Sequence, residues 1–123
     1  MSLKNYEKYV RYSDKIGYGD DTQYVTTMEC ADEILEKSAG KASEICRLIG
    51  WNKENSLNDM MLVRIDLKNI SRLNPRIPSG NEAGANEFFT PGGFTSGGII
   101  ELVLNRIPKT PNYVERIVHI ALE

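Results

Sequence analysis

Residues 99–107 read IIELVLNRI, and this short segment decides much of the predicted fold. Successive side chains of a strand point to opposite faces, and here both faces are mostly apolar. A strand of that kind is usually central and covered on both sides. Glu101 is its one acidic residue, and burying an unpaired carboxylate costs several kcal/mol. We therefore expect Glu101 near the core, either paired with a cation such as Arg64 or facing a cleft.

The segment just before this strand is rich in glycine. Residues 80–98 read GNEAGANEFFTPGGFTSGG and hold six of the ten glycines of the chain. Glycine loses more conformational entropy than any other residue on folding, so this density disfavours helix and strand. We expect a loop in which Gly92, Gly93 and the pair at 97–98 let the backbone approach a ligand or act as hinges, with Phe94 exposed. A plain flexible connection is the alternative.

A helix is predicted upstream, because apolar residues recur there at helical spacing. They are Ala31, Ile34, Leu35, Ala42, Ile45, Cys46 and Ile49. Thr26 and Thr27 offer capping hydroxyls at its start, Gly50 ends it, and Gly40 breaks it into two pieces. Cys30 and Cys46 fall on its apolar face, where we expect them to act as small hydrophobic residues rather than to form a disulfide.

Strands are predicted at residues 6–12, 23–27, 60–67 and 113–122 from their β-branched and aromatic content. Residues 13–21 and 68–80 are predicted as loops. Residues 108–112 are long enough to join 99–107 and 113–122 as an antiparallel hairpin. Strands that do not alternate strictly with helices indicate an α+β fold: a small, mainly antiparallel split sheet with one long or broken helix near the N-terminal half.

The composition is that of one globular domain spanning residues 1–123. Residues 1–3 are interpreted as a vector-derived leader and are left out of the fold prediction. A net charge of -2 disfavours general affinity for nucleic acids. No apolar run is long enough for a membrane helix or a signal peptide, so we expect no membrane partner and a soluble protein, cytoplasmic or secreted, that acts in a cytosol. Two cysteines and one histidine cannot assemble a Cys/His zinc site, and no metal is expected.

Four short motifs together resemble the Arg, Ser/Thr, Glu pattern of ADP-ribosyltransferases. They are YVRY at residues 9–12, YVTTM at 24–28 with Ala31 after it, LVRIDL at 62–67, and GGIIELV at 97–103. Residues 80–89, followed by Pro91-Gly92-Gly93, also look like segments of toxin domains at the C-termini of bacterial polymorphic secreted proteins. The pattern departs from the family in two places: Thr26 replaces the usual Ser, and Ile99 stands where a Glu or Gln is common. The chain is also short for this family.

The resemblance implies an NAD-dependent ADP-ribosyltransferase-like toxin or effector domain, with NAD as substrate and a protein or nucleic acid as the target. A cognate immunity protein is an implied partner, and the oligomeric state is left open. The implied catalytic residues are Glu101, Arg11, Thr26 and Thr27. The implied NAD-binding residues are Arg11, Tyr12, Tyr24, Gly92, Gly93 and Phe94.

Each implied role has a specific chemistry. Glu101 would hydrogen-bond a ribose hydroxyl and stabilise positive charge on the sugar, and Thr26 or Thr27 would orient it. Arg11 would hold a phosphate or the ribose on the nicotinamide side. Tyr12, Tyr24 or Phe94 would stack on nicotinamide. The loop from residue 92 to residue 98 would receive the target.

Other interpretations of these residues stay open. Arg11 is equally well explained as a solvated cation on a strand, and the two threonines as helix caps. His119 is the candidate acid or base of a small ribonuclease toxin, although an acidic chain is poorly suited to a polyanion, and a lone histidine is more often packed on a sheet face. A non-catalytic partner-binding module, such as an immunity or adaptor protein, is the third alternative.

Overall fold

The computed structural model describes residues 1–17, 22–52 and 57–123. The chain begins with the helical turn α1 (Leu3–Asn5), which continues into the π-helical turn η1 (Tyr6–Val10). Two α-helices follow, α2 (Met28–Ser38) and α3 (Ala42–Ile49), and later a 3-10 helix, η3 (Ile70–Leu73). The strands are β1 (Lys15–Ile16), β2 (Thr22–Val25), β3 (Met61–Leu67), β4 (Leu102–Asn105), β5 (Ile107–Pro108) and β6 (Val114–Ala121).

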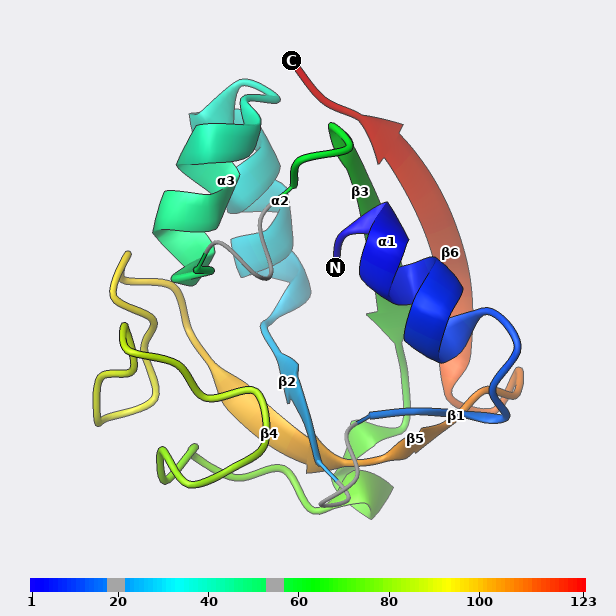
Figure 1. The fold of residues 1–123 in the computed structure, drawn as a ribbon. Helices are drawn as coiled ribbons and strands as arrows, with labels where there is room; N and C mark the ends of the chain where they lie inside the picture. The colour runs from blue at the N-terminus through cyan, green and yellow to red at the C-terminus, as the bar shows by residue number, and fades with distance from the viewer. Residues whose placement is uncertain (18–21, 53–56) are drawn as a thin grey trace.

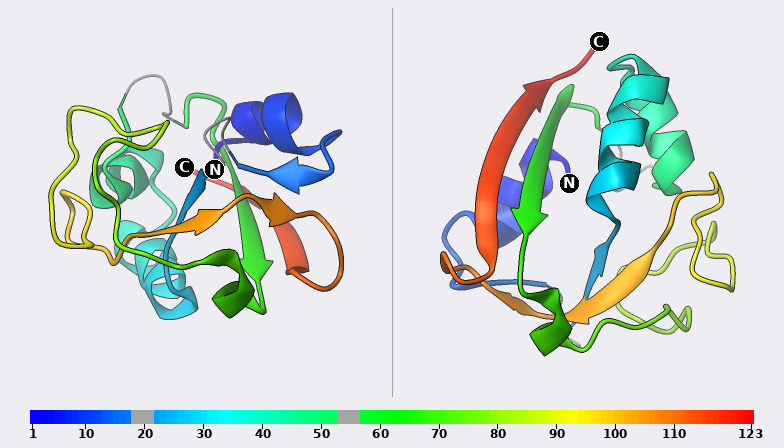
Figure 2. Two further views of the ribbon diagram at one scale, coloured as in Figure 1. Left: turned by 90° about the horizontal axis from the view of Figure 1, so that it is seen from below. Right: turned by 180° about the vertical axis from the view of Figure 1, so that it is seen from behind.

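The strands pair as three separate antiparallel ribbons: β1 with β5, β2 with β4, and β3 with β6. Figure 1 shows these ribbons and the helices arranged around a common interior, with α2 and α3 on one side and β3 and β6 on the other. The views in Figure 2 show the same arrangement, with β2 and β4 connecting the two sides. The predicted α+β class with a split antiparallel sheet is confirmed.

The broken helix is also confirmed. Thr27 caps α2, because its side-chain oxygen accepts a hydrogen bond from the backbone N–H of Cys30 at 3.1 Å. The helix stops where Ala39 and Gly40 take positive φ angles of 51° and 76°. The second helix, α3, ends at Gly50, whose φ of 81° lies in the left-handed region that glycine adopts at little cost. Local sequence signals therefore set both helices.

Two hydrophobic clusters form the core, and the segment 99–107 contributes to both. Ile99 packs with residues of α2 and α3, such as Ile34 and Ile45. Leu104 and Ile107 pack with a second cluster near the N-terminal turn. Both Val103 and Leu104 are fully buried, as expected for a strand that is apolar on both faces. Cys30 and Cys46 are free thiols on the first cluster, as predicted.

The predicted strand at residues 6–12 is wrong, because these residues are helical. The backbone N–H of Arg11 donates to the carbonyl of Tyr6 at 2.9 Å, and Ser2 caps the turn by accepting from the N–H of Asn5 at 3.2 Å. Tyr6 and Val10 lie four residues apart and pack on the same cluster, which is the spacing of one face of a helix. The tyrosine and valine content of this segment indicates a strand, but the spacing of its buried residues is helical.

Leaving residues 1–3 out of the fold was also wrong. The N-terminal amino group donates to the carbonyl of Val63 at 2.9 Å. Ser2 is only 4% exposed and forms a β-bridge with Leu62. These residues join the N-terminal turn to the start of β3.

The predicted hairpin between residues 99–107 and 113–122 does not form. Arg106 interrupts the first segment, β4 pairs with β2, and β5 pairs with β1. The reason is burial: Ile107 is 1% exposed and packs with Ile16 and Val10, which draws this end of the segment toward the N-terminal turn. The strand β6 pairs with β3 instead. The loop predicted at 68–80 contains η3, which places Leu73 in the same cluster.

A charged group lies inside the ribbon formed by β3 and β6. The carboxylate of Asp66 is 6% exposed and accepts hydrogen bonds from Arg64 at 2.7 Å and from the guanidinium of Arg116. Burial alone would raise the pKa of Asp66, but the bonds from the two guanidinium groups outweigh it and hold this pKa below the ordinary value of 3.8. The folded protein therefore binds this proton less tightly than the unfolded chain does.

We predict that Asp66→Ala lowers the free energy of unfolding by about 2 to 3 kcal/mol, because it leaves the nearly buried Arg64 without its main partner. Urea unfolding at pH 7 measures this loss. The matched control is Arg116→Ala, whose side chain is 61% exposed and should cost under about 1 kcal/mol. The difference between wild type and Asp66→Ala should shrink as the pH falls below 3.8. Equal losses in the two variants would contradict this assignment.

Candidate functional site

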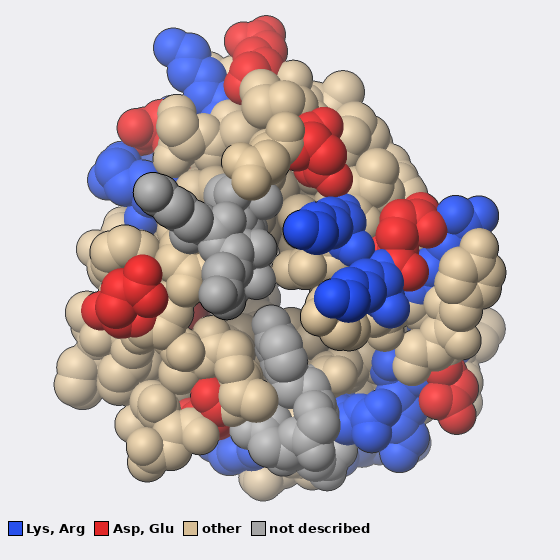
Figure 3. Space-filling view, viewed as in Figure 1, with Lys and Arg blue, Asp and Glu red and all other residues tan. Residues whose placement is uncertain are grey.

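A cavity of about 740 Å³ lies in the interior that the ribbons and helices enclose. Figure 3 shows the molecule hollowed near the centre of the face seen in Figure 1. Its wall is built from the N-terminal turn, β2, α2, β3, the glycine-rich loop and β4. Ligand-binding pockets usually measure about 300 to 1,000 Å³. The cavity is therefore large enough for a nucleotide-sized molecule.

Glu101 and Thr26 both belong to the cavity wall. The ladder between β2 and β4 ends at the pair of Val25 and Leu102, and each of the two residues lies one position beyond that pair. Both residues line the cavity, as do Thr27 and Tyr24. The side-chain oxygen of Thr26 is buried and has no hydrogen-bond partner within residues 1–17, 22–52 and 57–123. A buried hydroxyl of this kind can bond to a polar ligand.

The carboxyl group of Glu101 is partly buried, at the cavity rather than in the middle of the core. Loss of water raises its pKa above the ordinary value of 4.5, and the negative charge of Glu82 raises it further. Its backbone N–H donates to the carbonyl of Gly93 at 2.8 Å, which connects β4 to the glycine-rich loop. A proton can therefore be held at this carboxyl group at a higher pH than at an exposed glutamate.

An ion pair between Glu101 and Arg64, one of the two alternatives for this carboxyl group, does not form. Arg64 bonds instead to Asp66 at 2.7 Å and to Asp32 at 2.6 Å. Glu101 makes no ion pair with any residue that the structure describes. Of the two explanations for an acidic residue in this segment, the open cavity fits and the paired cation does not.

Arg11 and Tyr12 do not belong to this site. The guanidinium of Arg11 pairs with Glu7 at 2.7 Å and lies over the ring of Tyr12, 5.2 Å from its centre. Tyr12 is 85% exposed, and neither residue lines the cavity. Their assignment to the NAD site depended on a strand at residues 6–12, and the helical turn found there directs them to the surface.

Arg64 is an arginine that does line the cavity, and the sequence motifs had pointed to it only as a possible ion-pair partner of Glu101. Its side chain is 14% exposed. One feature of the sequence could have pointed to Arg64 as a site residue: the strand MLVRIDL is otherwise apolar, yet it contains an arginine and an aspartate two residues apart. Side chains two apart on a strand share a face, which brings Arg64 and Asp66 together as neighbours.

The glycine-rich loop is anchored to the C-terminal end of α3. The hydroxyl of Thr95 donates to the carbonyl of Leu48, and the side-chain amide of Asn86 donates to the carbonyl of Gly50 at 3.0 Å. Carbonyls at a helix C-terminus have no partner within the helix, so the loop satisfies two such groups. A side chain at Gly97 would collide with the backbone of Leu48. At Gly97 the missing side chain therefore allows the loop to pack closely against the end of α3.

The other predicted loop residues lie beside the cavity. Gly92, Gly93 and Phe94 do not line it, whereas the neighbouring Thr90, Thr95 and Ser96 do. Phe94 is 51% exposed, as expected, and forms a β-bridge with Ile100. Gly93 and Phe94 therefore both pair with residues of the cavity wall, Gly93 with Glu101 and Phe94 with Ile100.

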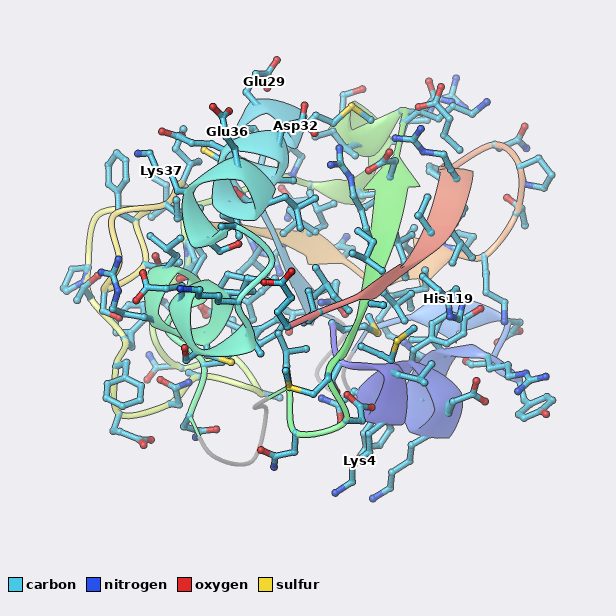
Figure 4. The ribbon with its side chains drawn as sticks, turned by 90° about the horizontal axis from the view of Figure 1, so that it is seen from above. Lys4, Glu29, Asp32, Glu36, Lys37 and His119 are labelled. Carbon is cyan, nitrogen blue, oxygen red and sulfur yellow. The ribbon has the colours of Figure 1, made fainter. Side chains whose placement is uncertain are left out.

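His119, the candidate ribonuclease residue, lies elsewhere. It is exposed on β6, opposite Val63, and its ring meets the edge of the Tyr6 ring at a centroid distance of 5.4 Å. Figure 4 shows it beside the N-terminal helical turn. It does not line the cavity, so it shares no site with Glu101.

The part of the chain that the structure describes contains neither a cluster of metal ligands nor a helix that could cross a membrane. Within residues 1–17, 22–52 and 57–123, no three His, Cys, Asp or Glu side chains gather closely enough to hold a metal ion. In the same ranges, no helix has the length and apolar character needed to span a bilayer.

Comparison of the chain with protein-family models, with curated proteins and with solved structures finds no match in any of the three. The resemblance to ADP-ribosyltransferases therefore rests on the four motifs alone.

We predict that Gly97→Ala lowers the free energy of unfolding by about 2 to 3 kcal/mol, because the added methyl group would push the loop away from α3. Urea unfolding measures the change. Gly98→Ala is the matched control: its φ of 85° disfavours alanine by about 1 kcal/mol, but a methyl group there would meet open space. A Gly97→Ala protein as stable as Gly98→Ala would show that the loop is not held against α3.

Proposed function

We propose that this protein is an NAD-dependent ADP-ribosyltransferase-like toxin or effector domain that modifies a macromolecular target. The proposal rests mainly on one observation: Glu101 is a partly buried carboxyl group on the wall of a nucleotide-sized cavity, and the same wall contains the unpaired hydroxyl of Thr26. The four sequence motifs favour the same chemistry.

In the proposed reaction, the bond between the ribose C1′ and the nicotinamide nitrogen breaks. Nicotinamide leaves with the bonding electron pair, and positive charge develops on the sugar. A nucleophilic oxygen or nitrogen of the target then bonds to C1′ and releases its proton to solvent water. The ionised carboxylate of Glu101 would stabilise the positive charge, and its effect is larger in a cavity than in open water.

Other residues of the cavity would bind the substrate. The hydroxyl of Thr26 would donate to Glu101 or to a ribose oxygen, and the ring of Tyr24 would stack on nicotinamide. Arg64 takes the phosphate-binding role first assigned to Arg11, because it lines the cavity. Its partner Asp32 is 70% exposed, so a phosphate can compete for the guanidinium at little cost.

We predict that Glu101→Gln reduces nicotinamide release from NAD at least about a hundredfold, because it removes the stabilising charge. The variant should also melt at a higher temperature at pH 7. Since the pKa of Glu101 is raised, the folded protein binds this proton more tightly than the unfolded chain, and the ionised form destabilises the fold above that pKa. Initial-rate assays and thermal unfolding measure the two effects. The exposed Glu87, changed to Gln, is the control and should alter neither.

An unfolded Glu101→Gln variant would point to a structural role for this residue. A folded variant with full activity would exclude Glu101 from catalysis. If wild type releases no nicotinamide but cleaves RNA, and His119→Ala does not, the ribonuclease alternative replaces this proposal.

We predict that kcat/KM for NAD falls as the pH drops through the pKa of Glu101, at a pH above 4.5, because the protonated carboxyl group no longer stabilises the cation. Glu82→Gln should move this fall in kcat/KM, the acidic limb of the pH profile, to lower pH, since the charge of Glu82 helps to raise the pKa of Glu101. The pH profiles of the two proteins measure the shift. A limb that stays in place, or moves to higher pH, would contradict the coupling between the two carboxyl groups.

A further inference from the structure

We infer that the N-terminal helical turn carries a docking surface for single-stranded nucleic acid, formed by Lys8, Tyr9, Arg11 and Tyr12. We refer to these four residues as the aromatic–basic surface. The inference names the macromolecular target of the proposed function and, in that respect, rests on it; the binding itself requires no NAD chemistry.

Two tyrosine rings of this surface are exposed, each with a cation beside it. Tyr9 is 57% exposed and Tyr12 is 85% exposed. The ammonium group of Lys8 lies 5.1 Å from the centre of the Tyr9 ring, and the guanidinium of Arg11 lies 5.2 Å from the centre of the Tyr12 ring. Proteins that bind single strands combine aromatic rings, on which bases stack, with cations that contact the phosphates. Both elements occur here twice, three residues apart.

The charge of the chain is distributed unevenly in favour of this surface. Residues 4–15 contain four basic and two acidic side chains, although the whole chain has a net charge of -2. One of the two, Glu7, pairs with Arg11 at 2.7 Å in an exposed ion pair, for which a phosphate can compete at little cost. Lys109 adds a further cation at the end of the turn, because its ammonium group donates to the carbonyls of Val10 at 2.7 Å and Arg11 at 2.8 Å. Figure 3 shows Lys and Arg side chains gathered over the N-terminal turn.

Three acidic side chains of α2 lie away from the N-terminal helical turn. In Figure 4, Glu29, Asp32 and Glu36 project from α2 on the far side of the molecule from Lys4 of that turn. Exposed charges further apart than about 10 Å are largely screened at physiological salt. The net negative charge of the chain, which disfavoured nucleic acid at the level of composition, therefore does not cancel the local field of residues 4–15.

The same geometry disfavours two other partners. A membrane surface requires an apolar helix face, but Val10 is 3% exposed and Tyr6 packs on the second core cluster, so the apolar side of this turn faces inward. An acidic protein would use the cations and leave the exposed rings without a role. A single strand uses both, whereas the bases of a duplex are already stacked on one another.

The surface also adjoins the candidate site. Tyr9 is both exposed and part of the cavity wall. A strand stacked on Tyr9 and Tyr12 would therefore have a nucleotide at the rim of the cavity that contains Glu101. The nucleic acid would then lie outside the cavity and NAD inside it, with the acceptor group of the nucleic acid near the cavity entrance.

The test is fluorescence anisotropy of a labelled 12-nucleotide oligo-U and oligo-dT with the full chain, without NAD, at 50 mM salt. We expect binding of both single strands and at least tenfold weaker binding of a 12-base-pair duplex. Tyr9→Ala/Tyr12→Ala should weaken binding about tenfold or more, whereas Tyr9→Phe/Tyr12→Phe should retain it, because phenylalanine preserves stacking. Lys8→Ala/Arg11→Ala should reduce the slope of log K against log salt by about 1.4.

The matched control is Lys37→Ala/Arg47→Ala, which removes two exposed cations that α2 and α3 hold in similar ion pairs. It should leave binding unchanged. Equal loss in both charge variants, equal binding of the duplex or of poly-glutamate, or no binding of single strands would each overturn the inference. Because NAD is absent, binding that depends on the tyrosines supports the surface even if Glu101→Gln shows the proposed function to be wrong. Loss of the binding alone leaves the NAD chemistry standing.

Discussion

The structure depends on the burial of residues 99–107 between two hydrophobic clusters. Ile99 belongs to the cluster around α2 and α3, while Leu104 and Ile107 belong to the cluster at the N-terminal turn. No paired sheet in the described residues exceeds two strands, and two-stranded ribbons are marginal alone. A segment that is buried at both ends joins them into one structure. The same burial divides the segment into β4, which pairs with β2, and β5, which pairs with β1, so that neither pairs with β6.

The position of Glu101 follows from that constraint. Val103 is fully buried, and Leu102 is paired with Val25, so the start of β4 cannot move without disturbing the core. The glycine-rich loop limits it from the other side, through Gly93 and through its attachment to α3. A carboxyl group held between two fixed elements is preorganised, which is the property that electrostatic catalysis requires.

Two carboxyl groups in this chain illustrate opposite results of burial. Asp66 is buried with two guanidinium partners, and its pKa is lowered because their hydrogen bonds outweigh the loss of water. Glu101 is less buried but has no cation, and its pKa is raised by the loss of water and by Glu82. The first group stabilises the fold when ionised, and the second destabilises it. Both residues line the cavity, but of the two only Glu101 has a carboxylate that no guanidinium of the described residues holds, which is why Glu101 and not Asp66 is the candidate catalytic group.

Local patterns in the sequence were enough to predict the broken helix, its Thr27 cap and the strands β2, β3 and β6. They also predicted the irregular backbone of the glycine-rich segment and singled out Glu101 as an acidic residue in an apolar strand. Each of these features depends on neighbouring residues or on a hydrophobic repeat of two to four residues. The tertiary structure alone decided that residues 6–12 are helical, that residues 99–107 pair with β2 and β1, that Arg64 rather than Arg11 faces the cavity, and that Gly97 packs against Leu48. These outcomes depend on which distant apolar surfaces are buried together, and a contact between segments far apart in the chain leaves no periodic signal in either one.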